Sequence, residues 1–478
     1  MSGFKQQAIS GVKWTTIATL TTAIIQLLRL SILTRYLEKS DFGIIAILTF
    51  VLGLTNTFAD LGFSSSIMHK QRLTEIQFSS LYWIQFIFFI FLFGIGTLLS
   101  PLISNFYNVD SISYLLPIVL LDLIFMGIGR LYDTVLQKDL LFKKIAIRNI
   151  ITALASLLVA IVLAIRGYGI YSLILSTLFQ TFLFNIWNFV SGQKCLKLRW
   201  TININEVYPL VKIGFYQTGT QLLDYFSAKF DVLIIGKLLG TEALGIYNLA
   251  KEFVMKVILL INSIANKVVL PLFAKFQNDH NLLRENYCKV INILSKINFP
   301  ICVLICILSK QIVYIIYGNE YEDVALLMSI LSLWSIFLTI GNPIGNIAIA
   351  TGKTNLSFKY TILRIVLAIP ILYFACLINI VAVAWSNVIM SFLLFLLGWK
   401  LLLNKIIGLS FKQYISSISK EVISSLLIGL ILYVIVSDNI LNLNDNAFIQ
   451  SVLYGCLVIF IYVLVYTYMY GINFYKKI

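Results

Sequence analysis

Charged side chains stand inside segments that are otherwise apolar enough to cross a bilayer. They are Arg29, Asp60, Asp122, Arg130, Asp224, Lys229, Asp231, Lys251, Glu252, Lys256, Lys267 and Lys296. A charge near the bilayer centre costs about 2.5–3.5 kcal/mol, so these side chains are expected to face a protein interior or a water-filled cavity. In segment 243–271 the lysines outnumber Glu252. This excess favours an anionic ligand, because a lysine ammonium binds phosphate as a point charge.

Polar residues also follow one face of the first apolar segment, between residues 11 and 36. The stripe consists of Thr15, Thr19, Thr22, Gln26 and Arg29, at alternating steps of four and three, a spacing that places them on one side of a helix. A second stripe with the same spacing consists of Gln217, Gln221, Asp224, Ala228 and Asp231. Two such stripes are expected to share an internal polar cavity. Two copies of one unit around a polar cavity are typical of a membrane transporter.

We therefore predict two sets of site residues. The substrate-binding cations are Arg29, Lys229, Lys251, Lys256 and Lys267. The residues that line or gate the cavity are Thr15, Thr19, Thr22, Gln26, Asp60, Gln217, Gln221, Asp224, Asp231 and Glu252.

Internal pairing is the alternative explanation for these charges. Glu252 and Lys256 are one helical turn apart and would neutralise each other, as would Asp224 and Lys229. A specific hypothesis is that Arg29 and Asp231 form an outer gate. The alternative is that each charge pairs within its own lobe, Asp231 with Lys229 or Lys237.

The elements that must position these residues are long helices. Of 478 residues, 59% are hydrophobic and 12% are charged, about half the charged fraction of a soluble domain. The chain is therefore expected to cross the membrane many times, with roughly 20 apolar residues per crossing. Fourteen segments are predicted, at approximately 9–36, 41–68, 78–103, 113–136, 145–165, 169–190, 211–238, 243–271, 288–316, 324–350, 356–377, 380–403, 421–437 and 448–471.

The net charge of +15 is explained by where the basic residues lie along the chain. Odd-numbered connections between the segments hold few of them, whereas the others hold many, including Lys70, Lys138, Lys143, Lys144, Arg148, Lys194, Lys197 and Arg199. Basic residues gather on the cytoplasmic side of membrane proteins, which predicts that both termini are cytoplasmic. The charge thus reports topology, and no nucleic-acid partner is expected.

Parts of the sequence repeat. Residues 32–44 (ILTRYLEKSDFGI) match 234–246 (IIGKLLGTEALGI), and Phe142-Lys143-x4-Arg148 matches Phe358-Lys359-x4-Arg364. Six predicted segments separate the copies, so both have the same orientation, related by an axis along the membrane normal. The predicted fold is all-α, with six-helix lobes at 1–200 and 201–408 and two further helices within 409–478. Chance similarity between apolar helices is the alternative.

Motifs for catalysis or for cofactors are not recognisable in the sequence. The six cysteines are scattered, and no phosphate-binding glycine loop, dinucleotide fingerprint or Ser-His-Asp set is found. We expect no metal and no cofactor, and we do not expect an enzyme.

Four short segments carry a resemblance to a known family. They are 8–14 (AISGVKW), 33–37 (LTRYL), 58–63 (FADLGF) and 136–140 (LQKDL). Together with fourteen predicted crossings, they resemble the polysaccharide exporter family of the multidrug/oligosaccharidyl-lipid/polysaccharide superfamily. Within that family, the sequence is most similar to exporters of the colanic-acid or teichuronic-acid type.

The resemblance implies a V-shaped cavity between two six-helix lobes, with alternating access. It also implies that an oligosaccharide on undecaprenyl diphosphate is flipped from the cytoplasmic to the outer leaflet of the inner (plasma) membrane. The expected partners are this lipid-linked anionic glycan, membrane lipids, and the polysaccharide polymerase and assembly proteins. Coupling to H⁺ or Na⁺ stays open. The alternatives are a drug antiporter of the same superfamily, which would normally stop at twelve crossings, and a membrane enzyme of polysaccharide assembly, which would need a large external loop.

Overall fold

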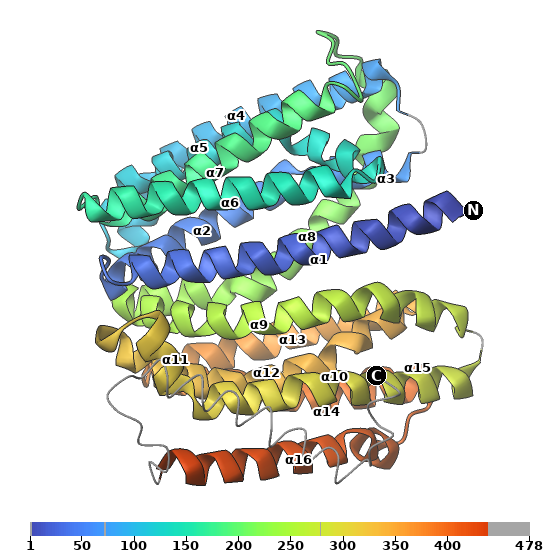
Figure 1. The fold of residues 1–478 in the computed structure, drawn as a ribbon. Coiled ribbons are helices and arrows are strands. Elements are labelled where there is room, and N and C mark those ends of the chain that lie inside the picture. Colours follow the sequence, from blue (N-terminus) through green and yellow to red (C-terminus); the bar gives the residue numbers. More distant parts are fainter. Residues whose placement is uncertain (1, 71–72, 278, 438–478) are drawn as a thin grey trace. The chain divides into compact units, whose positions relative to one another are not determined.

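The computed structural model describes residues 2–70, 73–277 and 279–437. These ranges are almost entirely helical and contain no strand (Figure 1). The predicted all-helical fold is therefore confirmed for the described part of the chain. The chain divides into two compact units, Met1–Gly245 and Ile246–Ile478, and each is described by itself.

The described residues of the first unit form eight helices and the beginning of a ninth. They are α1 (Ser2–Leu33), α2 (Lys39–Ala59), α3 (Phe63–His69), α4 (Glu75–Tyr107), α5 (Ser111–Lys138), α6 (Phe142–Ile165), α7 (Ile170–Gly192), α8 (Ile204–Leu238) and the start of α9 (Gly240–Lys275). Neighbouring helices pack in the order α1, α6, α7, α5, α4, while α2 packs against α5 and α8. The helix α5 is thus central, and half of the residues of its apolar membrane window are buried.

The second unit holds the rest of α9 and the helices that follow. They are α10 (His280–Ile307), α11 (Ser309–Ile316), a 3₁₀ turn (Asn319–Tyr321), α12 (Glu322–Ala350), α13 (Thr354–Cys376), α14 (Ile380–Gly398), a π-helical turn (Trp399–Leu403), α15 (Asn404–Ile407) and α16 (Phe411–Ser437). Here α12 lies between α10 and α14, and α13 packs on α14. In the first unit α5 lies between α4 and α7, and α6 packs on α7. The same packing order supports the predicted duplication, which stays a prediction, as do the lobe boundaries.

Eleven helices in the described ranges are long and apolar enough to cross a membrane. The helices α8 and α9, with 35 and 36 residues, are also long enough but are not among the eleven. The predicted segment 448–471 lies outside the described residues. The number of fourteen crossings therefore stays a prediction.

Two segments that were predicted as single helices are broken. The predicted helix 41–68 ends at Ala59 and resumes as α3 at Phe63, because Leu61 and Gly62 adopt left-handed backbone angles (φ +48° and +66°). The predicted helix 288–316 is interrupted at Leu308, between α10 and α11. Both predictions were wrong for the same reason: an apolar run does not show where the backbone turns.

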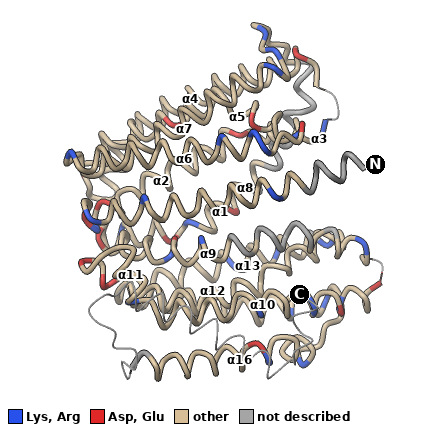
Figure 2. The backbone as a smooth tube through the Cα atoms, in the orientation of Figure 1, with Lys and Arg blue, Asp and Glu red and all other residues tan. Residues whose placement is uncertain are grey.

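Charged residues lie mostly toward the ends of the helices (Figure 2). At one such end the ammonium of Lys138, the last residue of α5, donates to the backbone carbonyls of Ile67 (2.9 Å) and Lys70. A cation is favourable at the C-terminus of a helix, where the last carbonyls lack partners. This contact fixes the short helix α3 against α5.

Candidate functional site

The guanidinium of Arg29 makes hydrogen bonds to other helices of the first unit. It donates to the hydroxyls of Ser156 on α6 (3.0 Å) and Thr177 on α7 (2.6 Å), and to the carbonyl of Leu173 on α7 (3.2 Å). Asp231 on α8 is 7% exposed and accepts a hydrogen bond from the backbone N–H of Val232 (3.0 Å). Arg29 thus ties α1 to α6 and α7 in this structure, and the gate with Asp231 stays a prediction.

The polar stripe of α1 lies on a distinct face of that helix. The hydroxyls of Thr15, Thr19 and Thr22 each donate to the carbonyl four residues earlier (2.7–2.8 Å), so their hydrogen-bonding needs are met within the helix. The opposite face of the helical wheel carries the exposed apolar residues Ile17, Leu20, Ile24 and Leu28. One face of α1 therefore suits lipid, and the polar face, which includes the exposed Gln26, points away from it.

Only part of the second polar stripe lies within the described residues. On α8 the side chain of Gln221 is half-buried and that of Asp224 is exposed, whereas the side chain of Gln217 lies outside the described residues. Lys229 is half-buried, and the described structure contains no ion pair between it and Asp224. Whether this stripe lines a cavity stays a prediction.

The predicted cations of α9 have aromatic and acidic neighbours. The ammonium of Lys251 lies 5.6 Å from the ring centroid of Tyr247 and 5.8 Å from that of Trp334. The ammonium of Lys256 lies 3.5 Å from the carboxylate of Glu252, with side chains 32% and 42% exposed. The i,i+4 pairing of Glu252 with Lys256 is therefore confirmed. The side chain of Lys267 lies outside the described residues.

Asp60 and Arg130, which the sequence placed in separate apolar segments, form an ion pair. The carboxylate of Asp60, a residue that is 4% exposed, accepts from the guanidinium of Arg130 (3.1 Å) and from the hydroxyl of Ser64 (2.7 Å). Arg130 also donates to the side-chain oxygen of Asn56. The pair therefore connects the turn between α2 and α3 with the second half of α5.

A second ion pair involves Arg148, which was grouped with the basic residues of the cytoplasmic side but falls near the start of the predicted segment 145–165. It lies inside α6 with a side chain that is 2% exposed. Its guanidinium donates to Asp133 on α5 (2.6 Å) and to Asn188 on α7, and stacks on Phe184 (3.8 Å to the ring centroid). A charge in the second turn of a helix can be buried when a partner from another helix reaches it.

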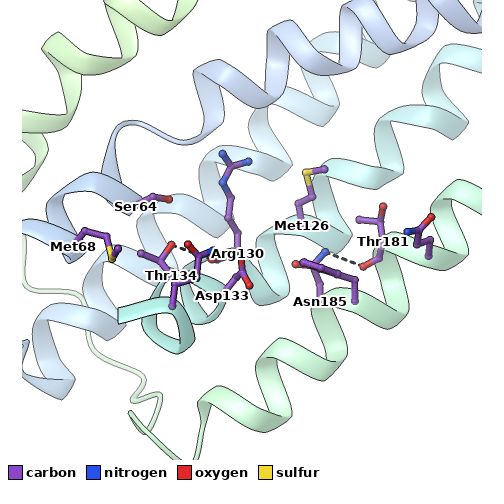
Figure 3. Close-up of a pocket in the computed structure, with 11 residues that line it drawn as sticks. Ser64, Met68, Met126, Arg130, Asp133, Thr134, Thr181 and Asn185 are labelled. Atoms are coloured by element: carbon purple, nitrogen blue, oxygen red, sulfur yellow. Dashed lines mark hydrogen bonds between the residues drawn. The ribbon is translucent and has the colours of Figure 1, made fainter. Parts of the chain in front are cut away.

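The two ion pairs border a cavity of about 670 Å³ among α3, α5 and α7. Its polar lining includes Ser64 from α3, Arg130, Asp133 and Gln137 from α5, and Gln180, Thr181 and Asn185 from α7. Figure 3 shows Arg130, Asp133 and Thr134 on one side of this space and Met126, Thr181 and Asn185 further along it. We call it the α3/α5/α7 cavity.

Sequence reasoning missed this cavity, although a signal was present. Thr177, Thr181, Asn185 and Asn188 follow one another on α7 at steps of four, four and three, which is a polar stripe like that of α1. The two stripes predicted from the sequence lie only in the first and seventh segments. This polar stripe on the sixth predicted segment was sufficient to predict that a neighbouring helix presents polar side chains to it.

Comparison with known proteins places the chain in a family. The family described as polysaccharide biosynthesis protein matches residues 32–326. The chain belongs to this family.

Two curated relatives cover most of its length. The lipopolysaccharide biosynthesis protein WzxC of Escherichia coli (strain K12) is 25% identical over 87% of this chain and 84% of its own. The teichuronic acid biosynthesis protein TuaB of Bacillus subtilis (strain 168) is 26% identical over 91% of this chain and 90% of its own. The resemblance to polysaccharide exporters of the colanic-acid or teichuronic-acid type is thereby confirmed.

Solved structures agree on the fold. The lipid II flippase MurJ, in an inward closed conformation, matches with a TM-score of 0.77 at 16% identity, over 96% of this chain and 99% of that one. A multidrug transporter of the MOP superfamily in an inward-facing conformation matches with a TM-score of 0.60 at 14% identity, over 80% of this chain and 97% of that one. At these identities the likeness shows a shared fold.

Proposed function

We propose that this protein flips a lipid-linked anionic oligosaccharide, carried on undecaprenyl diphosphate, from the cytoplasmic to the outer leaflet by alternating access. Two observations carry the proposal. The chain belongs to a family of polysaccharide biosynthesis proteins, and lysines lie on α9, a helix long enough to cross a membrane. The names of two relatives refer to lipopolysaccharide and teichuronic acid biosynthesis. The structural neighbour MurJ is named a lipid II flippase.

The physical requirements of such a substrate fit the charged residues. The hydroxyls of a sugar lose several hydrogen bonds to water if they enter lipid, so the head group needs a polar path. The polar face of α1 and the cations Lys251 and Lys256 offer polar and positive groups along the helices. A membrane potential that is negative inside adds to the driving force, because two negative charges moved outward through ~100 mV gain about 4.6 kcal/mol.

An enzyme of polysaccharide assembly fits less well. The longest connection between helices in the described ranges is 193–203, between α7 and α8, which is too short for a catalytic domain. No group of three or more His, Cys, Asp or Glu side chains that could hold a metal ion occurs among the described residues. The transporter proposal therefore accounts for more of the chain.

The test of this proposal removes one cation at a time from α9. We expect Lys251→Gln or Lys256→Gln to abolish surface glycan export in the producing cell at normal protein abundance, because each removes a charge that would hold the diphosphate. The matched control is Lys405→Gln, at an exposed lysine of α15, which should export normally. Equal loss in all three variants would indicate general fragility and contradict a cationic binding site.

A further inference from the structure

The α3/α5/α7 cavity lies at one end of the first unit. Its residues come from α3, from the second half of α5 and from 180–185, in the middle of α7. The distribution of basic residues predicts that these three helix portions lie toward the cytoplasm. This is the side on which a lipid-linked glycan would be loaded for flipping outward.

The charges around the cavity cancel. Arg130 is neutralised by Asp60 at 3.1 Å, and Asp133 by Arg148 at 2.6 Å. A diphosphate would bring negative charge to a site with no net positive charge, and an organic cation would find no net negative charge. The electrostatics therefore favour an uncharged ligand.

The cavity keeps hydrogen-bonding groups that an uncharged ligand could use. Gln180 is half-buried and makes no hydrogen bond to the described residues, so its amide can both donate and accept. Asn185 uses its NH₂ group on the Thr181 carbonyl (2.8 Å), which leaves its side-chain oxygen as an acceptor. Gln137 donates to Asp133 (2.8 Å) and likewise keeps its oxygen.

Two polar residues of the lining, Asp133 and Gln137, are held in place by hydrogen bonds, and Phe184 adds an aromatic ring. Asp133 accepts from both Arg148 and Gln137, and Arg148 stacks on Phe184. Fixed polar groups beside an apolar surface orient a small molecule, and the cavity volume is within the range of about 300–1,000 Å³ for such sites. Amides that donate and accept, beside an aromatic ring, match the hydroxyls and the C–H faces of a sugar.

We infer that the α3/α5/α7 cavity is a binding subsite for an uncharged sugar of the lipid-linked glycan, separate from the cations that hold its diphosphate; the inference rests on the proposed function. The cavity then recognises the glycan through hydrogen bonds, which a bare carrier lipid cannot make there.

The test compares three probes on the full-length protein in detergent, by native mass spectrometry. They are undecaprenyl diphosphate without sugar, the lipid-linked oligosaccharide extracted from membranes of the producing cells, and the oligosaccharide released from that lipid by mild acid. Wild type should bind the glycosylated lipid about tenfold more tightly than the bare lipid, the equivalent of one or two net hydrogen bonds. The released oligosaccharide should bind weakly, because it lacks the diphosphate.

The variants are made at Gln180, whose side chain can be changed without breaking the two ion pairs. Gln180→Leu should remove the tenfold preference for the glycosylated lipid and leave the binding of bare undecaprenyl diphosphate unchanged. Gln180→Glu adds a negative charge and should also leave the binding of the bare lipid unchanged. The control Gln277→Leu, the same replacement at an exposed position between α9 and α10, should behave as wild type.

The outcomes separate this inference from the proposed function. If wild type binds neither lipid, the proposed function fails. If wild type and Gln180→Leu bind both lipids with the same ratio of affinities, the function stands and the sugar subsite is overturned. If Gln180→Glu weakens binding of the bare lipid, the cavity holds the diphosphate and the assignment to an uncharged sugar is wrong. Equal melting temperatures of the variants exclude misfolding as the cause.

Discussion

In the first unit, Arg29 and Arg148 lie in hydrogen-bond networks between helices, whereas Lys256 of α9, in the second unit, lies in a partly exposed ion pair. Arg148 and Arg29 each make several hydrogen bonds to partners on other helices. Lys256 instead lies 3.5 Å from Glu252 on its own helix, and both side chains are partly exposed. Lys251 lies over aromatic rings.

This difference bears on what each set of charges can do. Breaking a buried pair is strongly destabilising, because it leaves an uncompensated charge. An exposed pair contributes about 0–1 kcal/mol and is easily exchanged for another partner. The buried arginines of the first unit therefore fix helix positions, and the lysines of α9 are better suited to take a phosphate and release it again.

Among the described residues of the second unit, one charged side chain is buried, and it lies away from α9. Glu421 on α16 is fully buried and accepts from Asn292 on α10 (2.6 Å), with the ammonium of Lys296 at 3.9 Å. This contact joins α16 to the rest of the unit. In both units, therefore, a buried charge has a partner on another helix. Three substitutions test whether such buried contacts stabilise the protein more than exposed pairs do.

The largest effect is expected at Arg148. Arg148→Met should destabilise the protein by about 3–5 kcal/mol, because Asp133, which is 22% exposed, would lose its counter-charge and the buried Asn188 would lose its donor. Thermal unfolding of the purified protein in detergent measures the loss. The control is Arg199→Met, which breaks an exposed pair with Glu75 (side chains 59% and 33% exposed) and should cost about 0–1 kcal/mol. Similar losses in the two variants would contradict the distinction between buried and exposed pairs.

An intermediate effect is expected at Glu421. Glu421→Gln can still accept from Asn292 but no longer neutralises Lys296, so the loss should be about 1–3 kcal/mol. The same unfolding measurement applies. A variant as stable as wild type would mean that α16 is held by apolar packing alone.

The smallest effect is expected at Glu252. Glu252→Gln should change stability by no more than about 0.5 kcal/mol, the usual value of an exposed i,i+4 pair. Glycan export should continue, because Lys251 and Lys256 keep their charges. A loss of stability comparable to that of Arg148→Met would contradict the view that the ion pair on α9 contributes less to stability than the network of Arg148.

Much of the architecture could be predicted from composition and periodicity. Thirteen of the fourteen predicted segments coincide with helices of the described structure, two of them broken by a turn. Apolar runs predict helices well because a membrane-spanning backbone must satisfy its hydrogen bonds within each segment. The breaks at Leu61 and Leu308 could not be predicted in this way, because they depend on local backbone angles and caps.

The sequence by itself determined the all-helical membrane fold, the family and the residues that are too polar for lipid. Only the tertiary structure decided which of those residues meet. Asp60 and Arg130 are 70 residues apart, and Asp133, Arg148 and Asn188 come from three helices. Helical periodicity reports the face of one helix, whereas pairing depends on which helices are neighbours and at what depth their side chains meet. That is why the cations were found from the sequence, and the neutral cavity among α3, α5 and α7 was not.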